Sequence, residues 1–284
     1  SYEKALTLGK EIKEKSDHNP NISEKFIRKL MPYQEESVEH LMEIGNGANF
    51  SVPGSGKTTI SYAAISRWKE DNTAQKIIVI GPTASFLPWE EEYGECFGKP
   101  ARSCRVNGDF ASKFHELGDS FDLFLMHHNT AMGRQWELQN FMQKWNTVLI
   151  MDESHYIKSP ALKRWASTAL IIAPYAKHRI ILSGTPMPNN AKDLWTQITF
   201  LWPQHLPLGN QILYNNYVKK NGIGKYQPVL DSLFCRIKKN TLNLPKPTWI
   251  THKVDLNTRQ RDIYNVIEAD TLKEINETNI QDQA

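Results

Sequence analysis

The segment formed by residues 48–60 restricts the possible folds of this chain more than any other. Its sequence, ANFSVPGSGKTTI, has the pattern of a short apolar strand, a glycine-containing loop and a helix that begins near Lys57. Gly54 and Gly56 allow the loop backbone to direct its N–H groups toward an anion, and the start of the helix adds positive potential. In such a loop the Lys57 ammonium reaches the β- and γ-phosphates of a nucleotide, and the Thr58 hydroxyl ligates Mg²⁺. The segment therefore predicts a phosphate-binding loop.

This loop departs from the full pattern G-x-x-x-x-G-K-[ST] at one position, because Ser51 stands where the first glycine is expected. The alternative interpretation is a chance Gly-Ser turn followed by a lysine. If the loop binds a nucleotide, the predicted contacts are Pro53, Gly54, Ser55, Gly56, Lys57, Thr58 and Thr59.

Short apolar runs alternate with helical patterns along the chain. Buried strands are predicted at residues 76–80, 121–126, 147–151 and 179–182, and helices near 86–93, 129–145, 160–173 and 190–201. Strands that alternate with helices favour a parallel sheet covered on both faces. We therefore predict an α/β fold of three layers with a central, mostly parallel sheet.

We expect four regions in the chain of 284 residues. Residues 1–29 have helical spacing and form an N-terminal extension, and residues 30–203 form the α/β domain. Residues 204–250 form a helical and basic subregion of that domain, and residues 251–284 a linker and the truncated start of a second lobe. Residues 249–256 alternate like a strand, and 258–277 read as a final helix.

Positive charge is concentrated in one stretch. Residues 219–254 contain eight basic side chains and one acid, although the net charge of the chain is only +3. Such a stretch is commonly a solvated face, and a nucleic-acid surface is the alternative.

Two acids, Asp152 and Glu153, follow the predicted strand at 147–151. They therefore lie at the carboxyl edge of the sheet, where ligands bind in parallel α/β folds. Asp152 can hold Mg²⁺ beside Thr58, and Glu153 can deprotonate the water that attacks a γ-phosphate. An ordinary Asp-Glu turn is the alternative. The phosphate loop with Lys57 is a second, independent signal for the same kind of site, and this weighs against the alternative.

The cysteine content and hydropathy exclude several classes of protein. The three cysteines are widely spaced and form no C-x-x-C pair, which indicates a reducing compartment without disulfides or a zinc site. No apolar run approaches the roughly 18 residues of a membrane-spanning helix. We expect an intracellular protein, cytoplasmic if it is bacterial or phage-encoded and nuclear if it is eukaryotic. We also expect a fragment of a longer chain, because the sequence begins at Ser1 and stops in a polar segment.

The segments above, taken in order, resemble the motifs of helicase superfamily two, and within it the Swi/Snf-type DNA translocase ATPases. Residues 30–34 resemble the adenine-recognising Q motif, with Gln34 as the adenine reader, and residues 51–59 resemble motif I, in which a small residue often replaces the first glycine. Residues 78–83, continuing to Trp89 and Glu92, resemble motif Ia, which touches the nucleic-acid backbone. Residues 152–155 are similar to motif II, with Ser154 in place of the usual alanine. Residues 182–190 are similar to motif III, which couples the ATP state to the grip on DNA.

The resemblance implies a RecA-like ATP-binding lobe that uses ATP and Mg²⁺ and acts on duplex DNA. It also implies a second RecA-like lobe with an arginine finger, which nothing after residue 267 resembles, so we expect weak nucleotide binding and poor hydrolysis by this chain alone. Residues implied in coupling or DNA contact are Thr83, His155, Ser183, Thr185, Arg236, Lys238 and Lys239. For His155, a relay near the phosphates and a purely structural role both stay open, and no Cys or His partner lies at zinc spacing.

Two other functions stay open. One is an RNA-dependent ATPase of the DExH type, although the region of Trp89 and the segment 236–239 favour DNA. The other is a non-catalytic nucleotide-binding scaffold, which the intact Lys57, Asp152 and Glu153 oppose.

Overall fold

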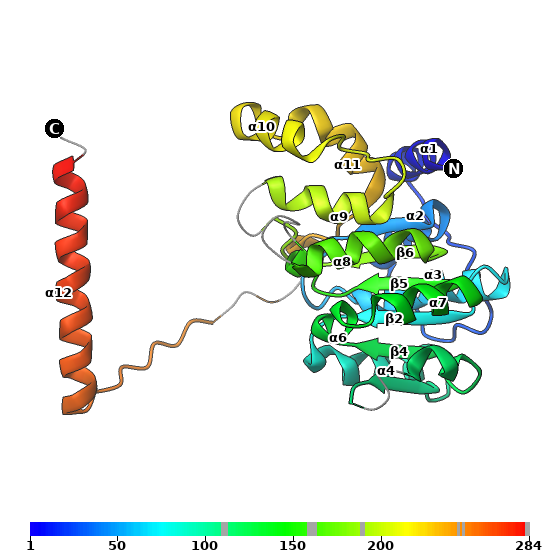
Figure 1. Ribbon diagram of the computed structural model, residues 1–284, viewed down its shortest axis with the longest axis horizontal. Helices are drawn as coiled ribbons and strands as arrows, with labels where there is room; N and C mark the ends of the chain where they lie inside the picture. Colours follow the sequence, from blue (N-terminus) through cyan, green and yellow to red (C-terminus); the bar gives the residue numbers. More distant parts are fainter. Residues whose placement is uncertain (109–112, 158–163, 188–190, 243–244, 246–247, 282–284) are drawn as a thin grey trace. The chain divides into compact units, whose positions relative to one another are not determined.

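The computed structural model describes residues 1–108, 113–157, 164–187, 191–242, 245 and 248–281. The chain divides into two compact units, Ser1–Asn243 and Leu244–Ala284. The first unit contains the sheet and its covering helices (Figure 1).

The first unit is built on a seven-stranded sheet with the order β3-β4-β2-β5-β6-β1-β7. All of its strand pairings are parallel. The strands are β1 (Asn46–Asn49), β2 (Lys76–Ile80), β3 (Ser103–Val106), β4 (Leu123–Met126), β5 (Thr147–Met151), β6 (His178–Leu182) and β7 (Phe234–Cys235). The predicted α/β class with a parallel central sheet is confirmed.

Helices cover both faces of this sheet. The helices α6 (His128–Met132), α7 (Gln135–Lys144), α8 (Arg164–Ile172) and α9 (Leu194–Leu201) pack on one face, and α3 (Lys57–Glu70) and α4 (Phe86–Phe97) pack on the other. Alternate residues of a strand enter opposite layers: Ile78 and Ile80 belong to the first core and Ile77 and Val79 to the second. Because both faces are buried, the strands read as continuous apolar runs in the sequence.

The remaining helices of the first unit are α1 (Tyr2–Glu14), α2 (Pro32–Ile44), α10 (Gln211–Asn221) and α11 (Gln227–Leu233). The predicted N-terminal extension is helical only over α1, which packs against α2 and α11. Proline in the first turn starts α2, and Gly45, with a positive φ of 73°, ends it. The Asn210 side chain caps α10 by accepting from the N–H groups of Ile212 and Leu213.

Two strands were not predicted. β3 is short and half-exposed along its length, and β7 has only two residues, Phe234 and Cys235. β7 pairs with β1, so part of the predicted helical and basic subregion belongs to the sheet itself. Strands this short carry no periodic signal, and their neighbours in the sheet define them.

The strand predicted at residues 249–256 is wrong. Residues 248–257 form no strand, and Trp249 and Val254 are 88% and 81% exposed. An alternating pattern forms a strand only where a neighbouring strand accepts its hydrogen bonds. The described part of this unit also contains the helix α12 (Thr258–Gln281), and a helix offers no strand edge for such hydrogen bonds.

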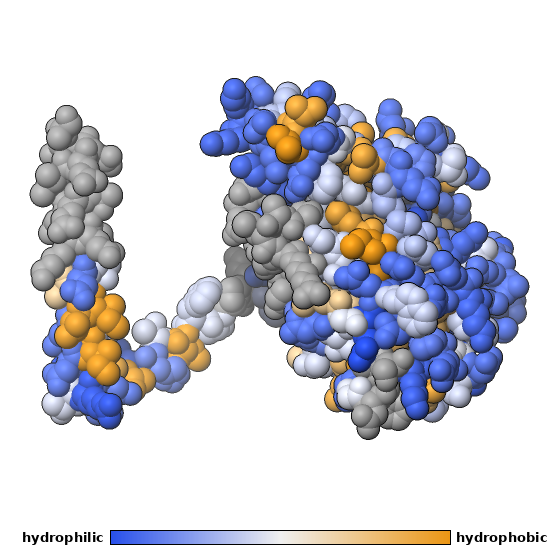
Figure 2. Space-filling model, viewed as in Figure 1, coloured by the Kyte–Doolittle hydropathy of each residue, from blue (hydrophilic) through white to orange (hydrophobic). Residues whose placement is uncertain are grey.

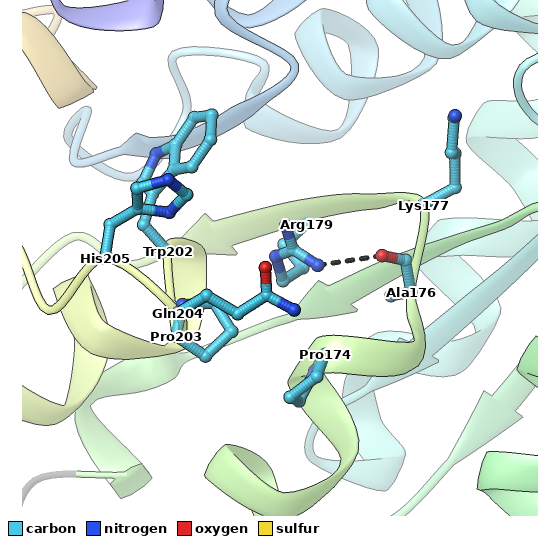
Figure 3. A pocket seen from close by; sticks show the side chains of 8 residues that line it. All are labelled: Pro174, Ala176, Lys177, Arg179, Trp202, Pro203, Gln204 and His205. Atoms are coloured by element: carbon cyan, nitrogen blue, oxygen red, sulfur yellow. Dashed lines mark hydrogen bonds between the residues drawn. The ribbon is translucent and has the colours of Figure 1, made fainter. Parts of the chain in front are cut away.

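A buried cation joins several elements at the amino edge of β6. The Arg179 guanidinium donates to the carbonyls of Ala173, Ala176 and Leu201 at 2.7–2.9 Å, and burial lowers its pKa to about 10. It therefore ties the turn that follows α8 to the last residue of α9, whose carbonyl lies in the final turn of that helix. A cavity of about 190 Å³ opens beside it, at the opposite edge of the sheet from the phosphate loop (Figure 3).

The surface of the first unit is mainly hydrophilic in the view of Figure 2, with small apolar patches over α8 and α10. Ile171 on α8 and Ile212 and Leu213 on α10 are among the exposed apolar side chains. Among the described residues, no helix is both long and apolar enough to cross a bilayer.

Candidate nucleotide-binding site

The predicted loop follows β1 at the carboxyl edge of the sheet and leads directly into α3. Gly54 and Gly56 both have positive φ, 79° and 80°, which side-chain-bearing residues rarely adopt. A Cβ on Gly56 would lie 2.2 Å from Nε2 of Gln34. The positive φ therefore favours glycine at position 56, and a Cβ there would also require the Gln34 side chain to shift.

The loop fits a bound phosphate by its own geometry. It ends at the N-terminus of a helix of 14 residues, whose first N–H groups have no partner within the helix. The Ser55 hydroxyl is buried and makes no hydrogen bond to any of the described residues. An unpaired buried hydroxyl in an anion-binding loop is accounted for by a ligand that occupies it.

Lys57 is the first residue of α3 and folds back over this loop. Its ammonium donates to the Ser51 carbonyl at 3.1 Å and to the Val52 carbonyl at 3.5 Å. Burial lowers its pKa, and the negative charges of Glu153 and Asp152 oppose this shift. The lysine and the two acids thus lie within electrostatic range of one another, as the sequence predicts.

Gln34 connects the segment 30–34 to the loop. Its side chain is buried, its Oε1 accepts from the Met31 N–H at 2.9 Å, and its Nε2 donates to the Ser55 carbonyl at 3.0 Å. Thr58 is half-buried in the first turn of α3. The Thr59 hydroxyl donates to the Glu92 carboxylate of α4, so only its backbone remains for the nucleotide contact predicted for it.

Asp152 and Glu153 follow β5 at the same edge. Asp152 Oδ2 accepts from the Trp89 indole Nε1 at 3.0 Å, and Oδ1 accepts from the Glu153 N–H at 3.0 Å. Glu153 has a positive φ of 51°, a sparsely populated conformation for a residue with a side chain. The two contacts fix the Asp152 carboxylate beside the loop.

Trp89 is a residue whose role the sequence did not reveal. Its motif resemblance implied contact with nucleic acid, but the side chain is only 1% exposed, and its ring packs edge-on against Tyr62. Burial excludes a nucleic-acid contact by Trp89, and its N–H instead orients a predicted magnesium ligand.

The segment after β6 contacts the end of β1 and the loop that follows it. The Ser183 N–H donates to the Asn49 carbonyl at 3.2 Å, and the Ser183 hydroxyl accepts from the Thr185 N–H at 3.1 Å. A Cβ on Gly184 would lie 3.1 Å from the ring of Pro53. The motif III-like segment therefore packs directly on the phosphate loop.

A buried glutamine on α9 links this segment to the acids. Gln197 accepts from the Ser154 hydroxyl at 2.7 Å and donates to the carbonyls of Pro186 at 2.7 Å and Asp193 at 3.0 Å. The signal that could have revealed it is a single amide in an apolar helix, LWTQITFL. Ser154, which departs from the motif, is the other half of this link.

The predicted nucleic-acid residues lie apart along the same edge. Thr83 is exposed just after β2, and Arg236, Lys238 and Lys239 are exposed just after β7, with β5, β6 and β1 between. The His155 backbone lies in the short helix Ser154–Ile157, but its side chain lies outside the described part. The described residues contain no cluster of three or more His, Cys, Asp or Glu able to hold a metal ion.

A parallel sheet with a phosphate loop after β1 and paired acids after β5 defines the first unit as a RecA-like nucleotide-binding lobe of the P-loop class. Residues 33–284 match the family model described as SNF2-related domain, and the chain belongs to that family.

Among curated relatives, the Helicase swr1 of Schizosaccharomyces pombe is 26% identical over 84% of this chain and 21% of its own length. The Helicase SWR1 of Saccharomyces cerevisiae is 26% identical over 64% of this chain and 12% of its own. The chain thus spans about a fifth or less of these relatives.

Solved structures agree with the fold. The Sulfolobus solfataricus SWI2/SNF2 ATPase core in complex with dsDNA has a TM-score of 0.63 and 25% identity, covering 76% of this chain and 46% of that one. The Sulfolobus solfataricus SWI2/SNF2 ATPase core domain has a TM-score of 0.64 and 24% identity, covering 80% of this chain and 48% of that one.

Proposed function

We propose that this chain is the ATP-binding lobe of a Swi/Snf-like, DNA-dependent ATPase that hydrolyses ATP to ADP and phosphate to move along or remodel complexes of duplex DNA. The observation that carries the proposal is the meeting of the phosphate loop with Asp152 and Glu153, whose charges act on Lys57. Family membership and the similarity to a core solved with dsDNA support it.

In this proposal each residue has a defined task. The loop N–H groups and Lys57 bind the phosphates, Gln34 reads the adenine, and Thr58 and Asp152 hold Mg²⁺. The metal supplies positive charge to the phosphates when bound. Glu153 orients the attacking water and accepts its proton.

Contact with duplex DNA is proposed for the exposed side chains of Thr83, Arg236, Lys238 and Lys239, with His155, Ser183 and Thr185 coupling it to the nucleotide. A second RecA-like lobe of the full-length chain would close over the site and supply an arginine finger, worth about 10³–10⁵ in rate in other P-loop enzymes. Translocation along DNA and an intracellular location, nuclear if the source is eukaryotic, belong to the same proposal.

The test is ATP hydrolysis by the full-length protein with duplex DNA, with RNA and with neither. Stimulation by duplex DNA supports the proposal, and stimulation by RNA alone assigns the chain to the RNA-dependent class. Binding of labelled ATP without hydrolysis under any of the three conditions would leave the scaffold interpretation and overturn the proposed ATPase.

A further inference from the structure

Ser51 makes three hydrogen bonds through three different groups. Its N–H donates to Asn49 Oδ1 at 3.1 Å, its carbonyl accepts from Lys57 Nζ at 3.1 Å, and its hydroxyl accepts from the Ile237 N–H at 2.8 Å. The residue is fully buried. A glycine, which the general pattern has at this position, would lack the hydroxyl and could not make the third bond.

The bond to Ile237 belongs to a ladder that extends beyond the sheet. β1 pairs with β7 in the register Asn49↔Cys235. Beyond it, the Phe50 N–H donates to the Cys235 carbonyl at 2.9 Å, and the Val52 N–H donates to the Ile237 carbonyl at 3.2 Å. The Ser51 hydroxyl fills the interval between these two bonds, so the start of the phosphate loop is paired with the backbone after β7.

The segment paired with the loop is the basic one. In residues 235–239 the side chains alternate: Cys235 and Ile237 are buried, while Arg236, Lys238 and Lys239 are exposed. Ile237 therefore anchors the segment in the core while its basic neighbours face outward. Three cationic side chains on one short exposed segment suit the phosphates of a nucleic-acid backbone.

The lysine that is proposed to bind the nucleotide phosphates also contacts the start of the loop, where the loop pairs with the segment after β7. Lys57 bonds the carbonyls of Ser51 and Val52, the two residues that also hold Ile237. If the ammonium turned to nucleotide phosphates, these carbonyls would lose their charged donor. A shift of the backbone at 51–52 would then reach Ile237 through the Ser51 hydroxyl and the ladder.

We propose that Ser51 is a positioning residue that couples nucleotide occupancy of the phosphate loop to the affinity of the basic segment 236–239 for nucleic-acid phosphates. The inference rests on the proposed function, because it assumes that the same protein binds both ligands. Coupling of this kind is reciprocal, so DNA must change nucleotide affinity by the factor with which nucleotide changes DNA affinity.

The experiment measures duplex-DNA affinity of the full-length protein with and without ADP across a range of salt concentrations. In the unmodified protein we expect coupling in the typical range of about 5–150-fold. We also expect the slope of log affinity against log salt to differ by about 1 to 3 between the two states, because the segment offers three cations. In Ser51→Ala the coupling falls to about onefold and the two slopes become equal.

Two further variants keep the result interpretable. Ser51→Gly also removes the hydroxyl but places there the residue that the general pattern contains, so it serves if the alanine variant fails to fold. Ser61→Ala is the matched control, because it removes a buried serine hydroxyl that bonds only the Lys57 carbonyl within α3. It should retain the coupling.

Retained coupling and unequal slopes in both folded Ser51 variants would overturn the inference and leave the proposed function intact. Absence of coupling in the unmodified protein, with both ligands bound, would also overturn the inference alone. Failure of the unmodified protein to bind either ligand would overturn the proposed function itself.

Discussion

The substitution Trp89→Phe tests whether a buried indole holds Asp152, the proposed magnesium ligand, in place. It retains an aromatic ring against Tyr62 but removes the N–H that donates to Asp152 Oδ2 at 3.0 Å. A hydrogen bond to a charged group is worth about 1.5–3 kcal/mol. At about 1.4 kcal/mol per tenfold change, this corresponds to a loss of roughly 10–100-fold in affinity for Mg²⁺-nucleotide, which matches the usual effect of removing the partner of a metal ligand.

The assay is a titration with fluorescent ATP analogue in Mg²⁺ and again in EDTA. We expect the loss in Mg²⁺ and near-equal affinities of variant and unmodified protein in EDTA, because the proposed role of Asp152 is to bind the metal. Tyr62→Phe is the control, since it removes a buried hydroxyl that donates to the Trp89 carbonyl at 2.8 Å without touching Asp152. A Trp89→Phe variant that is folded and binds Mg²⁺-nucleotide as tightly as the control would refute the reasoning.

Three further predictions follow from the same contacts. Glu153→Gln should lower ATP hydrolysis by the full-length protein by about 10²–10⁴-fold while nucleotide binding persists, and undiminished turnover would show that Glu153 is not the base. Gln197→Ala leaves the Ser154 hydroxyl and the Pro186 carbonyl without their partner. Urea unfolding should therefore show a decrease in the free energy of unfolding of about 1–3 kcal/mol for each buried group left unpaired. Gln204→Ala, at an exposed position, is the control and should show a decrease near zero. Burial lowers the pKa of His178 to about 4, below the 6.5 of the unfolded chain, so its contribution to stability is fully present above pH 6.5 and is lost as pH falls toward 4. The free energy of unfolding should therefore drop by about 3 kcal/mol over that interval, and the drop should be smaller in His178→Gln. Parallel loss of stability in the two proteins would contradict this prediction.

The sequence predicted the central strands and their strand-loop-helix unit closely. β2 and β5 occupy the predicted residues, because runs of four and five consecutive apolar or β-branched residues buried on both faces leave little ambiguity. The phosphate loop was equally clear, since glycine conformations, a helix start and a lysine are all local properties. The proximity of Lys57 to Asp152 and Glu153 could be inferred because parallel strands bring their carboxyl ends to one edge of the sheet.

Residues that act through contacts between distant segments escaped prediction. Gln197 lies 43 residues after Ser154 in the chain, and Trp89 lies 63 residues before Asp152. No local pattern marks which buried amide or indole will face a strand end, because that depends on how α4 and α9 pack. β7 was missed for the same reason, because its pairing with β1 and not its own sequence pattern makes it a strand. Residues 249–256 are the opposite case: they have the alternating pattern of a strand but no neighbouring strand to pair with.

The sequence by itself determined the class of fold, the phosphate loop and the acids that meet it, because each is encoded within a few neighbouring residues. Only the tertiary structure decided what Ser51 does. In the sequence it is a departure from the glycine pattern, and in the folded chain its hydroxyl holds the backbone of Ile237 across 186 residues of sequence. Hydrogen bonds between distant segments depend on packing of the whole sheet, and such bonds join the loop to the basic segment after β7.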